Sequence, residues 1–205
     1  MKPLLLVGGG GHCHACIDVI EAVGAFRIQG IVQRADEERS PVLGYPVIGS
    51  DNDLVRLLES TPSALVTVGQ ISSPDVRVAL HDLLVDLGAS LPPIISPTSY
   101  ISSRSSIGDG TIVMHGAIVN ALASVGRNCI VNSQTLIEHD AVVGNHCHVS
   151  TGARVNGGVN IGPGTFIGSG AILRDGVRIG ANCIVGAGTT VLRDLPDETK
   201  YLGMP

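Results

Sequence analysis

One short segment gathers the side chains best suited to acid–base chemistry. Glu138, His139 and Asp140 are consecutive, and His146 and His148 follow within the next eight residues. A carboxylate beside an imidazole holds one ring tautomer and raises the basicity of the ring, which is what a general base needs. A solvated surface histidine is the alternative, and the crowding of acids and histidines favours function over it. A zinc site is a weaker interpretation of the same cluster.

A glycine-rich loop follows the first apolar run of the chain. Residues 4–7 predict a buried strand, and residues 8–11 are all glycine, before a predicted helix. Backbone N–H groups at such a helix start bind anions, so we expect a nucleotide phosphate here. Cys13 replaces the third glycine of the dinucleotide fingerprint, and the second predicted strand ends in Gln33-Arg34 rather than in an acid. Hydride transfer is therefore disfavoured, and a tight turn without a ligand is the remaining alternative.

The elements that must position these side chains come from a six-residue repeat. Residues 95–196 divide into 17 hexads without an insertion, and the first residue of every hexad is Ile, Val or Leu. A helix repeats its apolar positions every 3.6 residues and a strand every two, so a strict period of six predicts a β-helix of short strands and turns. The fifth position is mostly small, and we expect positions one and five to face inward.

A second period of 18 residues lies on the first and predicts three hexads per coil. It is marked by a column of glycines at hexad position two: Gly108, Gly126, Gly144, Gly162 and Gly180. We expect them to stack along one edge of a triangular prism, where glycine permits backbone angles that a Cβ would oppose. His139 and Asp140 take positions three and four, which face outward, and His148 takes position six on the adjoining face. Asn120, Asn132 and Asn156 take position two, where ladders and a site are both open interpretations.

The first 93 residues have a different pattern. Apolar runs at 4–7, 28–33 and 64–68 predict strands, and residues 14–23, a segment from Asp51 or Asp53 to Glu59, and 74–87 predict helices. Residues 41–49 are expected to be a turn-rich connection. Alternating strands and helices indicate a small Rossmann-like parallel α/β domain. The predicted division is residues 1–93 and residues 94–205, with a short extension after the last hexad.

Composition limits the partners and the compartment. The formal charge is −5 and no basic block is present, which disfavours nucleic acid. The first apolar run is too short for a signal sequence or a membrane span. Cys129, Cys147 and Cys183 take the small inward position, and Cys13-x-x-Cys16 has no second pair downstream, which favours helix packing over zinc or redox chemistry. We expect reduced cysteines and a cytoplasmic protein.

Five motifs together resemble one family. They are Gly8 to His12, Gly69-Gln70, Val131-Asn132 with Ile137 to Asp140, His148 to Ala153, and Tyr201 to Pro205. In this order they resemble the bacterial hexapeptide-repeat acetyltransferases that act on nucleotide-linked 4-amino-4,6-dideoxyhexoses, as in the bacillosamine and perosamine pathways. The resemblance covers essentially the whole chain. It implies a left-handed β-helix, a homotrimer with active sites between neighbouring prisms, acetyl-CoA as the acyl donor, and no metal.

The resemblance also implies residue roles. His139 would be the general base, with Asp140 enhancing its basicity. His148 would contact the thioester region, and the backbone around Gly157, Ser169 and Ala187 would line the pantetheine channel. The nucleotide sugar would be held by Gly10, Gly11, His12 and Gly69. Gln33 and Arg34 stand where relatives often place an acidic pair against uracil, so a GDP-linked sugar is as open as a UDP-linked one.

Two other classes of function stay open. The same base on a hydroxyl acceptor would make a sialic acid or sugar O-acetyltransferase. A β-helix metalloenzyme of the carbonic-anhydrase type, or a non-catalytic nucleotide-sugar binder, would fit the fold without acetyl transfer. The expected reaction is direct N-acetylation of the sugar C4 amine. No acyl-enzyme is expected, because the cysteines of the repeat face inward.

Overall fold

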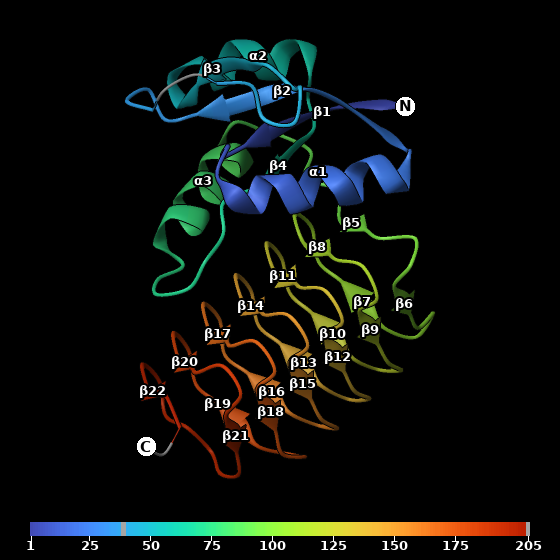
Figure 1. Cartoon of the computed structure of the whole chain (residues 1–205), viewed down its shortest axis with the longest axis vertical. Helices are drawn as coiled ribbons and strands as arrows, with labels where there is room; N and C mark the ends of the chain where they lie inside the picture. Colours follow the sequence, from blue (N-terminus) through green and yellow to red (C-terminus); the bar gives the residue numbers. More distant parts are fainter. Residues whose placement is uncertain (38–39, 204–205) are drawn as a thin grey trace.

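The computed structural model describes residues 1–37 and 40–203. It consists of an N-terminal α/β domain placed against one side of a long β-helix (Figure 1). Both parts of the predicted fold class are confirmed: a small Rossmann-like parallel sheet comes first and a left-handed parallel β-helix of hexapeptide repeats follows.

The N-terminal domain is a four-stranded parallel sheet with helices on both faces. Its elements are β1 (Lys2–Val7), α1 (Gly11–Val23), β2 (Phe26–Gln33), β3 (Val47–Ser50), the 3-10 helix η1 (Asp51–Asp53), α2 (Leu54–Ser60), β4 (Ala64–Val66) and α3 (Asp75–Asp86). The strand order is β3-β2-β1-β4. Successive strand residues face opposite ways, so Leu4 and Leu6 pack with α1, whereas Leu5 and Val7 pack with α2 and α3.

Two details of this domain differ from the sequence prediction. Residues 47–50 form the edge strand β3, which begins inside the segment 41–49 that we predicted to be a turn-rich connection. The strand is short and flanked by turn residues, so its alternation is too brief to outweigh them. The helix predicted to start near residue 14 starts at Gly11, because the glycine loop itself forms the first turn.

The β-helix is built from two-residue strands that fall on hexad positions six and one. Three parallel sheets result. The sheet that faces the N-terminal domain contains β5 (Ile94–Ile95), β8 (Ile112–Val113), β11 (Ile130–Val131), β14 (His148–Val149), β17 (Phe166–Ile167), β20 (Ile184–Val185) and β22 (Lys200–Tyr201). We call it the domain-facing sheet.

The other two sheets follow in chain order. The second sheet contains β6 (Tyr100–Ile101), β9 (Ile118–Val119), β12 (Leu136–Ile137), β15 (Arg154–Val155), β18 (Ile172–Leu173) and β21 (Thr190–Val191). The third contains β7 (Ser106–Ile107), β10 (Ser124–Val125), β13 (Val142–Val143), β16 (Asn160–Ile161) and β19 (Arg178–Ile179). Partners such as Val131 and Val149 are 18 residues apart, which confirms three hexads per coil.

The end of the chain continues the fold rather than leaving it. The last hexad ends near Leu195, which bridges to Ile179, and β22 then pairs with β20 on the domain-facing sheet. The predicted short extension therefore adds a further strand. Met204 and Pro205, the end of the last motif, lie outside the described residues.

The core of the β-helix confirms that positions one and five face inward. Val131, Val149 and Val155 at position one and Thr135, Cys147 and Ala153 at position five are completely buried. The free cysteines 129, 147 and 183 belong to this core, whereas Cys13 and Cys16 pack between α1 and its neighbours. Position six is buried only on the domain-facing sheet, where the N-terminal domain covers it, at Ile94, Ile112, Ile130 and His148.

The stacked glycines have a different physical reason from the predicted one. Gly108, Gly126, Gly144, Gly162 and Gly180 do stack, but none of them has a positive φ. The left-handed angles occur two residues later, at hexad position four: Gly110, Gly116, Leu122, Asn128, Gln134, Asp140, His146, Gly152, Gly158, Gly164, Gly170, Gly176, Asn182 and Gly188. The position-two glycines are instead required because the next coil passes too close for a side chain.

Gly144→Ala should therefore destabilise the β-helix. An added Cβ would lie 2.8 Å from the backbone nitrogen of Pro163 and 2.9 Å from the carbonyl oxygen of Ile161, and neither can move without shifting the coil. Such overpacking typically costs about 1–3 kcal/mol, which urea unfolding would measure. The matched control is Gly176→Asn, at a left-handed position with open space, where Asn is tolerated and a loss of about 1 kcal/mol or less is expected. A larger loss at Gly176 than at Gly144 would contradict this account.

Candidate active site

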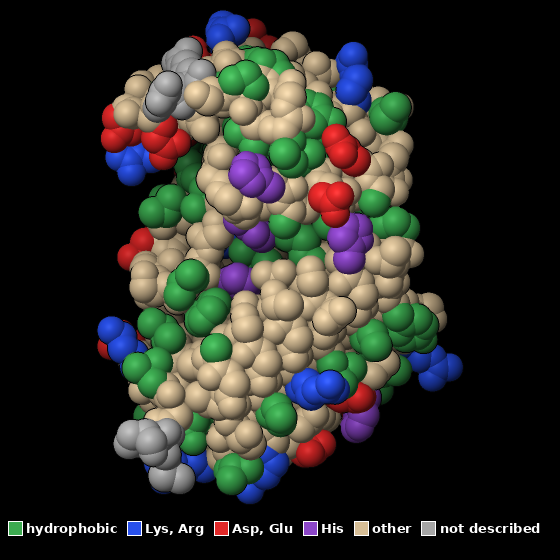
Figure 2. Space-filling view, in the orientation of Figure 1, with side chains coloured by type: hydrophobic (Ala, Val, Ile, Leu, Met, Phe, Trp, Pro, Cys, Tyr) green, Lys and Arg blue, Asp and Glu red, His purple; other side chains and the backbone are tan. Residues whose placement is uncertain are grey.

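The glycine loop lines one wall of a large cavity at the carboxyl edge of the four-stranded sheet. The cavity has a volume of about 1070 Å³ and extends from the ends of β2 and β3 past the glycine loop to β14. We call it the interdomain cavity. All six residues predicted to bind the nucleotide sugar line it: Gly10, Gly11, His12, Gln33, Arg34 and Gly69. In the space-filling view, histidine side chains gather in the hollow between the two domains (Figure 2).

The middle of the cavity suits an anion. Gly10 is the N-cap of α1 and no side chain caps this helix, so its first N–H groups are not satisfied by a capping oxygen. Gly8 adopts φ 113°. Its N–H donates to the carbonyl oxygen of Val32 at 2.8 Å, and its own carbonyl oxygen accepts from the Thr67 hydroxyl at 2.6 Å. These bonds hold the loop open in front of the helix dipole, which is a favourable place for a phosphate.

His148 forms a buried wall of the cavity at its other end. Its Nδ1 donates to the carbonyl oxygen of Gln70 at 2.6 Å, and its Nε2 accepts from the side-chain amide of Asn132 at 3.1 Å. Burial lowers the pKa of His148 to about 4, so the ring is neutral. Because Nε2 carries a lone pair in this tautomer, His148 is not arranged to donate to an oxyanion.

Two polar atoms beside His148 lack partners among the described residues. They are Nε2 of His12 and Oε1 of Gln70, and both are buried. The Gln70 amide nitrogen donates to the carbonyl of Gly164 at 3.0 Å, which holds its oxygen in place. Burial, with smaller effects of Arg77 and His148, lowers the pKa of His12 to about 3. Buried polar groups are rarely left unpaired, so this end of the cavity is prepared for a polar ligand or for water.

His139 and Asp140 form a second, separate arrangement. They lie in the turn between β12 and β13, on the edge that joins the second sheet to the third. Nδ1 of His139 donates to Oδ2 of Asp140 at 2.8 Å, which leaves Nε2 with its lone pair available as a base. This hydrogen bond is the main reason that the pKa of His139 is raised above its ordinary value.

Neighbouring coils shape the surroundings of this imidazole. Glu138 accepts from the Asn120 amide at 2.9 Å and from the His139 backbone N–H at 3.2 Å, which orients the turn. Gly157 lies one coil further along, where a Cβ would come within 2.8 Å of Cε1 of the His139 ring. A glycine at that position is therefore needed for the ring to lie where it does.

The predicted site residues are not brought together within one chain. The edge that carries His139 and Gly157 is the prism edge opposite the domain-facing sheet, and we call it the far edge. Ser169 and Ala187 lie on a different edge, between the domain-facing sheet and the second sheet, where Ser169 and Ser150 share a hydrogen bond of 2.9 Å. His146 lies on the third edge. The sequence cluster of three histidines is therefore divided among two edges and a sheet, because each hexad turns the chain to a new face.

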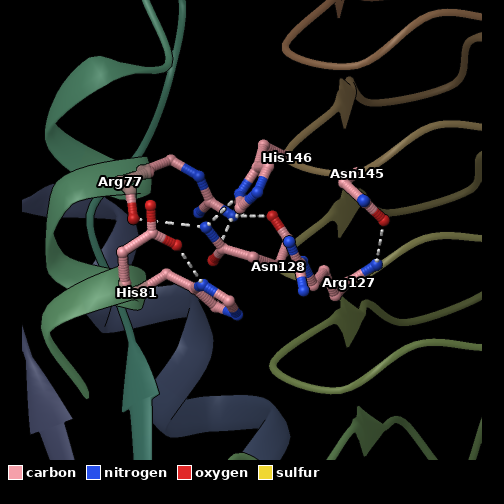
Figure 3. A network of polar contacts seen from close by, with 7 residues as sticks. Arg77, His81, Arg127, Asn128, Asn145 and His146 are labelled. Carbon is pink, nitrogen blue, oxygen red and sulfur yellow. Dashed lines mark hydrogen bonds and ion pairs between the residues drawn. The ribbon is translucent and has the colours of Figure 1, made fainter. Parts of the chain in front are cut away.

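A buried polar network joins the two domains beside the cavity (Figure 3). The guanidinium of Arg77 donates to the carbonyls of Val68 and Asn128 at 2.9 and 2.6 Å, and the Asn128 amide donates to Nδ1 of His146 at 2.9 Å. Arg77 comes from α3 and Asn128 from the β-helix. The network therefore fixes the strand end that leads into Gly69 and Gln70.

A group of possible metal-ligand atoms among the described residues lies in the same region. Atoms of His81, Asp82 and His146 lie within 4.8 Å of one another. His81 is already bonded to Asp82 at 3.1 Å, His146 accepts from Asn128, and the buried cation Arg77 is adjacent. A buried positive charge beside these atoms repels a metal cation, so the cluster fits a metal ion poorly. In the described part of the chain, no helix is long and apolar enough to cross a membrane.

Sequence reasoning assigned no site role to two residues that line the cavity, Gln70 and Asp51. It left open whether Asn132 belongs to a site, and the structure shows that its side chain fixes the ring of His148. Gln70 follows Gly69 and was visible as part of a motif, but nothing in the local sequence marks Asp51. Its position depends on β3, which the sequence did not predict.

Comparisons with known proteins match both parts of the chain. Residues 3–81 match the PglD N-terminal domain, and residues 158–193 match the bacterial transferase hexapeptide (six repeats). A histidine-to-asparagine mutant of perosamine N-acetyltransferase from Caulobacter crescentus, in complex with CoA and GDP-perosamine, is 36% identical over 96% of this chain and 91% of that chain, with a TM-score of 0.90. The acetyltransferase domain of PglB from Neisseria gonorrhoeae, in complex with acetyl coenzyme A, is 31% identical over 96% and 94%, with a TM-score of 0.85.

A more distant structure, WeeI from Acinetobacter baumannii, shares the fold at 19% identity with a TM-score of 0.74 over 96% of this chain and 94% of that chain. No curated protein matches the chain. The hexapeptide-repeat β-helix and these relatives place the chain in the class of hexapeptide-repeat acyltransferases. Within that class, this chain belongs to the bacterial sugar acetyltransferases that carry a PglD-type N-terminal domain.

Proposed function

We propose that this protein is an acetyl-CoA-dependent N-acetyltransferase that acts on the C4 amine of a nucleotide-linked 4-amino-4,6-dideoxyhexose. The observation that carries the proposal is the close structural agreement over nearly the whole chain with an enzyme crystallised with CoA and GDP-perosamine. The interdomain cavity and the His139–Asp140 pair supply the two parts that such a reaction needs. Residues 1–93 would bind the nucleotide sugar, and residues 94–205 would carry the acyl transfer.

The reaction follows from the tautomer of His139. The free Nε2 takes a proton from the sugar amine as the amine nitrogen attacks the thioester carbonyl of acetyl-CoA. The new C–N bond forms, the C–S bond breaks, and the departing CoA thiolate receives the proton. Asp140 stabilises the imidazolium that forms in between. Cysteines 129, 147 and 183 are buried, which supports direct transfer without an acyl-enzyme.

A homotrimer would complete the active site. Within one chain the far edge faces away from the interdomain cavity, so the imidazole of one chain would serve the cavity of the next. Apolar side chains are exposed on and around the far edge: Ile118, Leu122, Val142, Ile172 and Leu192. Exposed apolar side chains of this kind are typical of a surface that a second copy covers. Gly157, on one chain, and Ser169 and Ala187, on another, would then border one acetyl-CoA channel, with His148 at the sugar end.

The test of the proposed function is an acetyl-transfer assay that detects the free CoA thiol. Acetyl-CoA is supplied with UDP- and GDP-linked 4-amino-4,6-dideoxyhexoses, and with sialic acid as a hydroxyl acceptor. Thiol release that depends on an amino sugar, with the amide product seen by mass spectrometry, supports the proposal. Release only with the hydroxyl acceptor would make the protein an O-acetyltransferase instead. No acceptor-dependent release would refute acetyl transfer.

The pH dependence of the rate should report the His139–Asp140 hydrogen bond. The base must be unprotonated, so activity falls as the pH drops through the pKa of His139, which Asp140 raises. Asp140→Asn removes the charge but keeps a side chain that tolerates φ 60°. The acidic limb of the kcat profile should then move to lower pH, and the maximal rate should fall about tenfold because the base is weaker. Asp175→Asn, which removes a charge that is not bonded to the ring, should shift the limb far less; equal shifts in both variants would contradict the assignment.

A further inference from the structure

The two ends of the interdomain cavity differ, and this difference indicates which end would hold the base of a bound nucleotide. This inference rests on the proposed function. Phosphates belong at the glycine loop and the α1 N-terminus, in the middle of the cavity. The sugar must reach toward Gln70 and His148, because acetyl transfer takes place on the β-helix. The base therefore lies toward the ends of β2 and β3, where Gln33, Arg34 and Asp51 line the cavity.

Asp51 is the more buried of two carboxylates at this end of the cavity, since the other, Glu37, is exposed. The nearby Asp53 accepts from the Ser50 backbone and hydroxyl at 2.8 and 3.2 Å, so the cap of η1 is provided without Asp51. The guanidinium of Arg34 is held in a two-point ion pair by Asp36, at 3.0 and 2.7 Å. Among the described residues the carboxylate of Asp51 makes no hydrogen bond, although it is half-buried and burial raises its pKa.

A second observation at the same end also indicates a ligand. Gln33 is only 8% exposed, and its Oε1 is buried without a hydrogen-bond partner in the described structure. The half-buried Asp51 carboxylate and the unpaired Gln33 amide oxygen make this end of the cavity a hydrogen-bond acceptor. An acceptor-rich site selects a ligand that presents donors.

We infer that Asp51 recognises the Watson–Crick edge of guanine, which makes this enzyme selective for a guanine-linked sugar. Guanine presents N1–H and the 2-amino group side by side, and the two oxygens of one carboxylate accept both in a two-point contact. Uracil presents a single N–H between two carbonyl oxygens. A carboxylate there would make one hydrogen bond and face a carbonyl with its other oxygen, which disfavours the wrong base as well as favouring the right one.

The test measures nucleotide binding by calorimetry, which needs no acetyl transfer. GDP, IDP and UDP are titrated into the wild-type protein and into Asp51→Asn. IDP lacks only the 2-amino group. We expect wild type to bind GDP at least about tenfold more tightly than IDP or UDP, as the loss of a hydrogen bond to a charged group implies. In Asp51→Asn the affinity for GDP should fall at least about tenfold and that for UDP should change little, so that the preference disappears.

The control and the contrary outcomes separate the alternatives. Asp86→Asn makes the same chemical change on the exposed C-terminal turn of α3 and should leave all three affinities unchanged. Equal weakening of GDP, IDP and UDP in Asp51→Asn would place the carboxylate on the ribose and overturn the inference. An unchanged GDP affinity, or a wild type that prefers UDP, would also overturn it while leaving the proposed function intact. If none of the three binds, the proposed function fails together with the inference.

Discussion

Replacing His139 with alanine should lower kcat by between about a hundredfold and ten-thousandfold, the range that general-base catalysis contributes. The only free nitrogen of the ring is Nε2, since Nδ1 is committed to Asp140. No other side chain on the far edge is a comparable base, because its other titratable side chains are carboxylates and arginines. Steady-state kinetics with saturating acetyl-CoA and amino sugar would measure the loss.

The side chain of His139 is 64% exposed, so its removal should leave the free energy of unfolding almost unchanged, within about 0.5 kcal/mol. His115 provides a matched control, because it too is paired with a carboxylate, through its Nε2 at 2.9 Å from Asp18, and it lies away from the far edge. His115→Ala should change kcat less than about threefold. A fall of less than roughly tenfold in His139→Ala would mean that the general base is elsewhere.

Two inactive variants should restore activity when they assemble together. His139→Ala lacks the base. Gly10→Glu places a negative charge at the phosphate position, and the chain tolerates it because Gly10 has φ −72° and nothing lies within 4 Å of an added Cβ. If one chain supplies the cavity and its neighbour the imidazole, random assembly at equal amounts leaves one of four pairings intact, or about a quarter of the wild-type activity.

The comparison needs both proteins to be co-expressed or refolded together, so that mixed trimers form. Mixing the two variants after separate assembly serves as the control and should give little activity unless subunits exchange. A co-assembled sample as inactive as its parents would contradict a site shared between chains. Size-exclusion chromatography with light scattering would report the trimer independently.

The sequence alone predicts those features of the fold and the site that depend on interactions between residues close together in the chain. The strict hexad specified the β-helix because every coil repeats the same burial of one aliphatic and one small side chain, so no long-range information is required. The outward placement of His139 and Asp140 followed from the same phase. The glycine loop likewise predicted the start of a helix, since its backbone freedom and its position after a strand are both local.

Other features had no local signal. The left-handed angles lie at hexad position four and not at the stacked glycines of position two. Glycine suits both positions, at position four because it permits a positive φ and at position two because it has no Cβ, so the residue type alone does not tell them apart. The edge strand β3 was missed, and with it the position of Asp51. His148 is buried because the N-terminal domain packs over its face of the prism, which the repeat does not reveal.

By itself, then, the sequence determined the coil, its inward and outward positions, and the pairing of an outward His139 with its acidic neighbour Asp140, since all of these depend on periodicity and on adjacent residues. Only the tertiary structure decided which edge of the prism each histidine occupies and which side chains meet in the interdomain cavity. Those relations join residues far apart in the sequence; the hydrogen bond between His148 and Gln70, for example, spans 78 positions. They arise from the packing of one domain on the other, which no local pattern encodes.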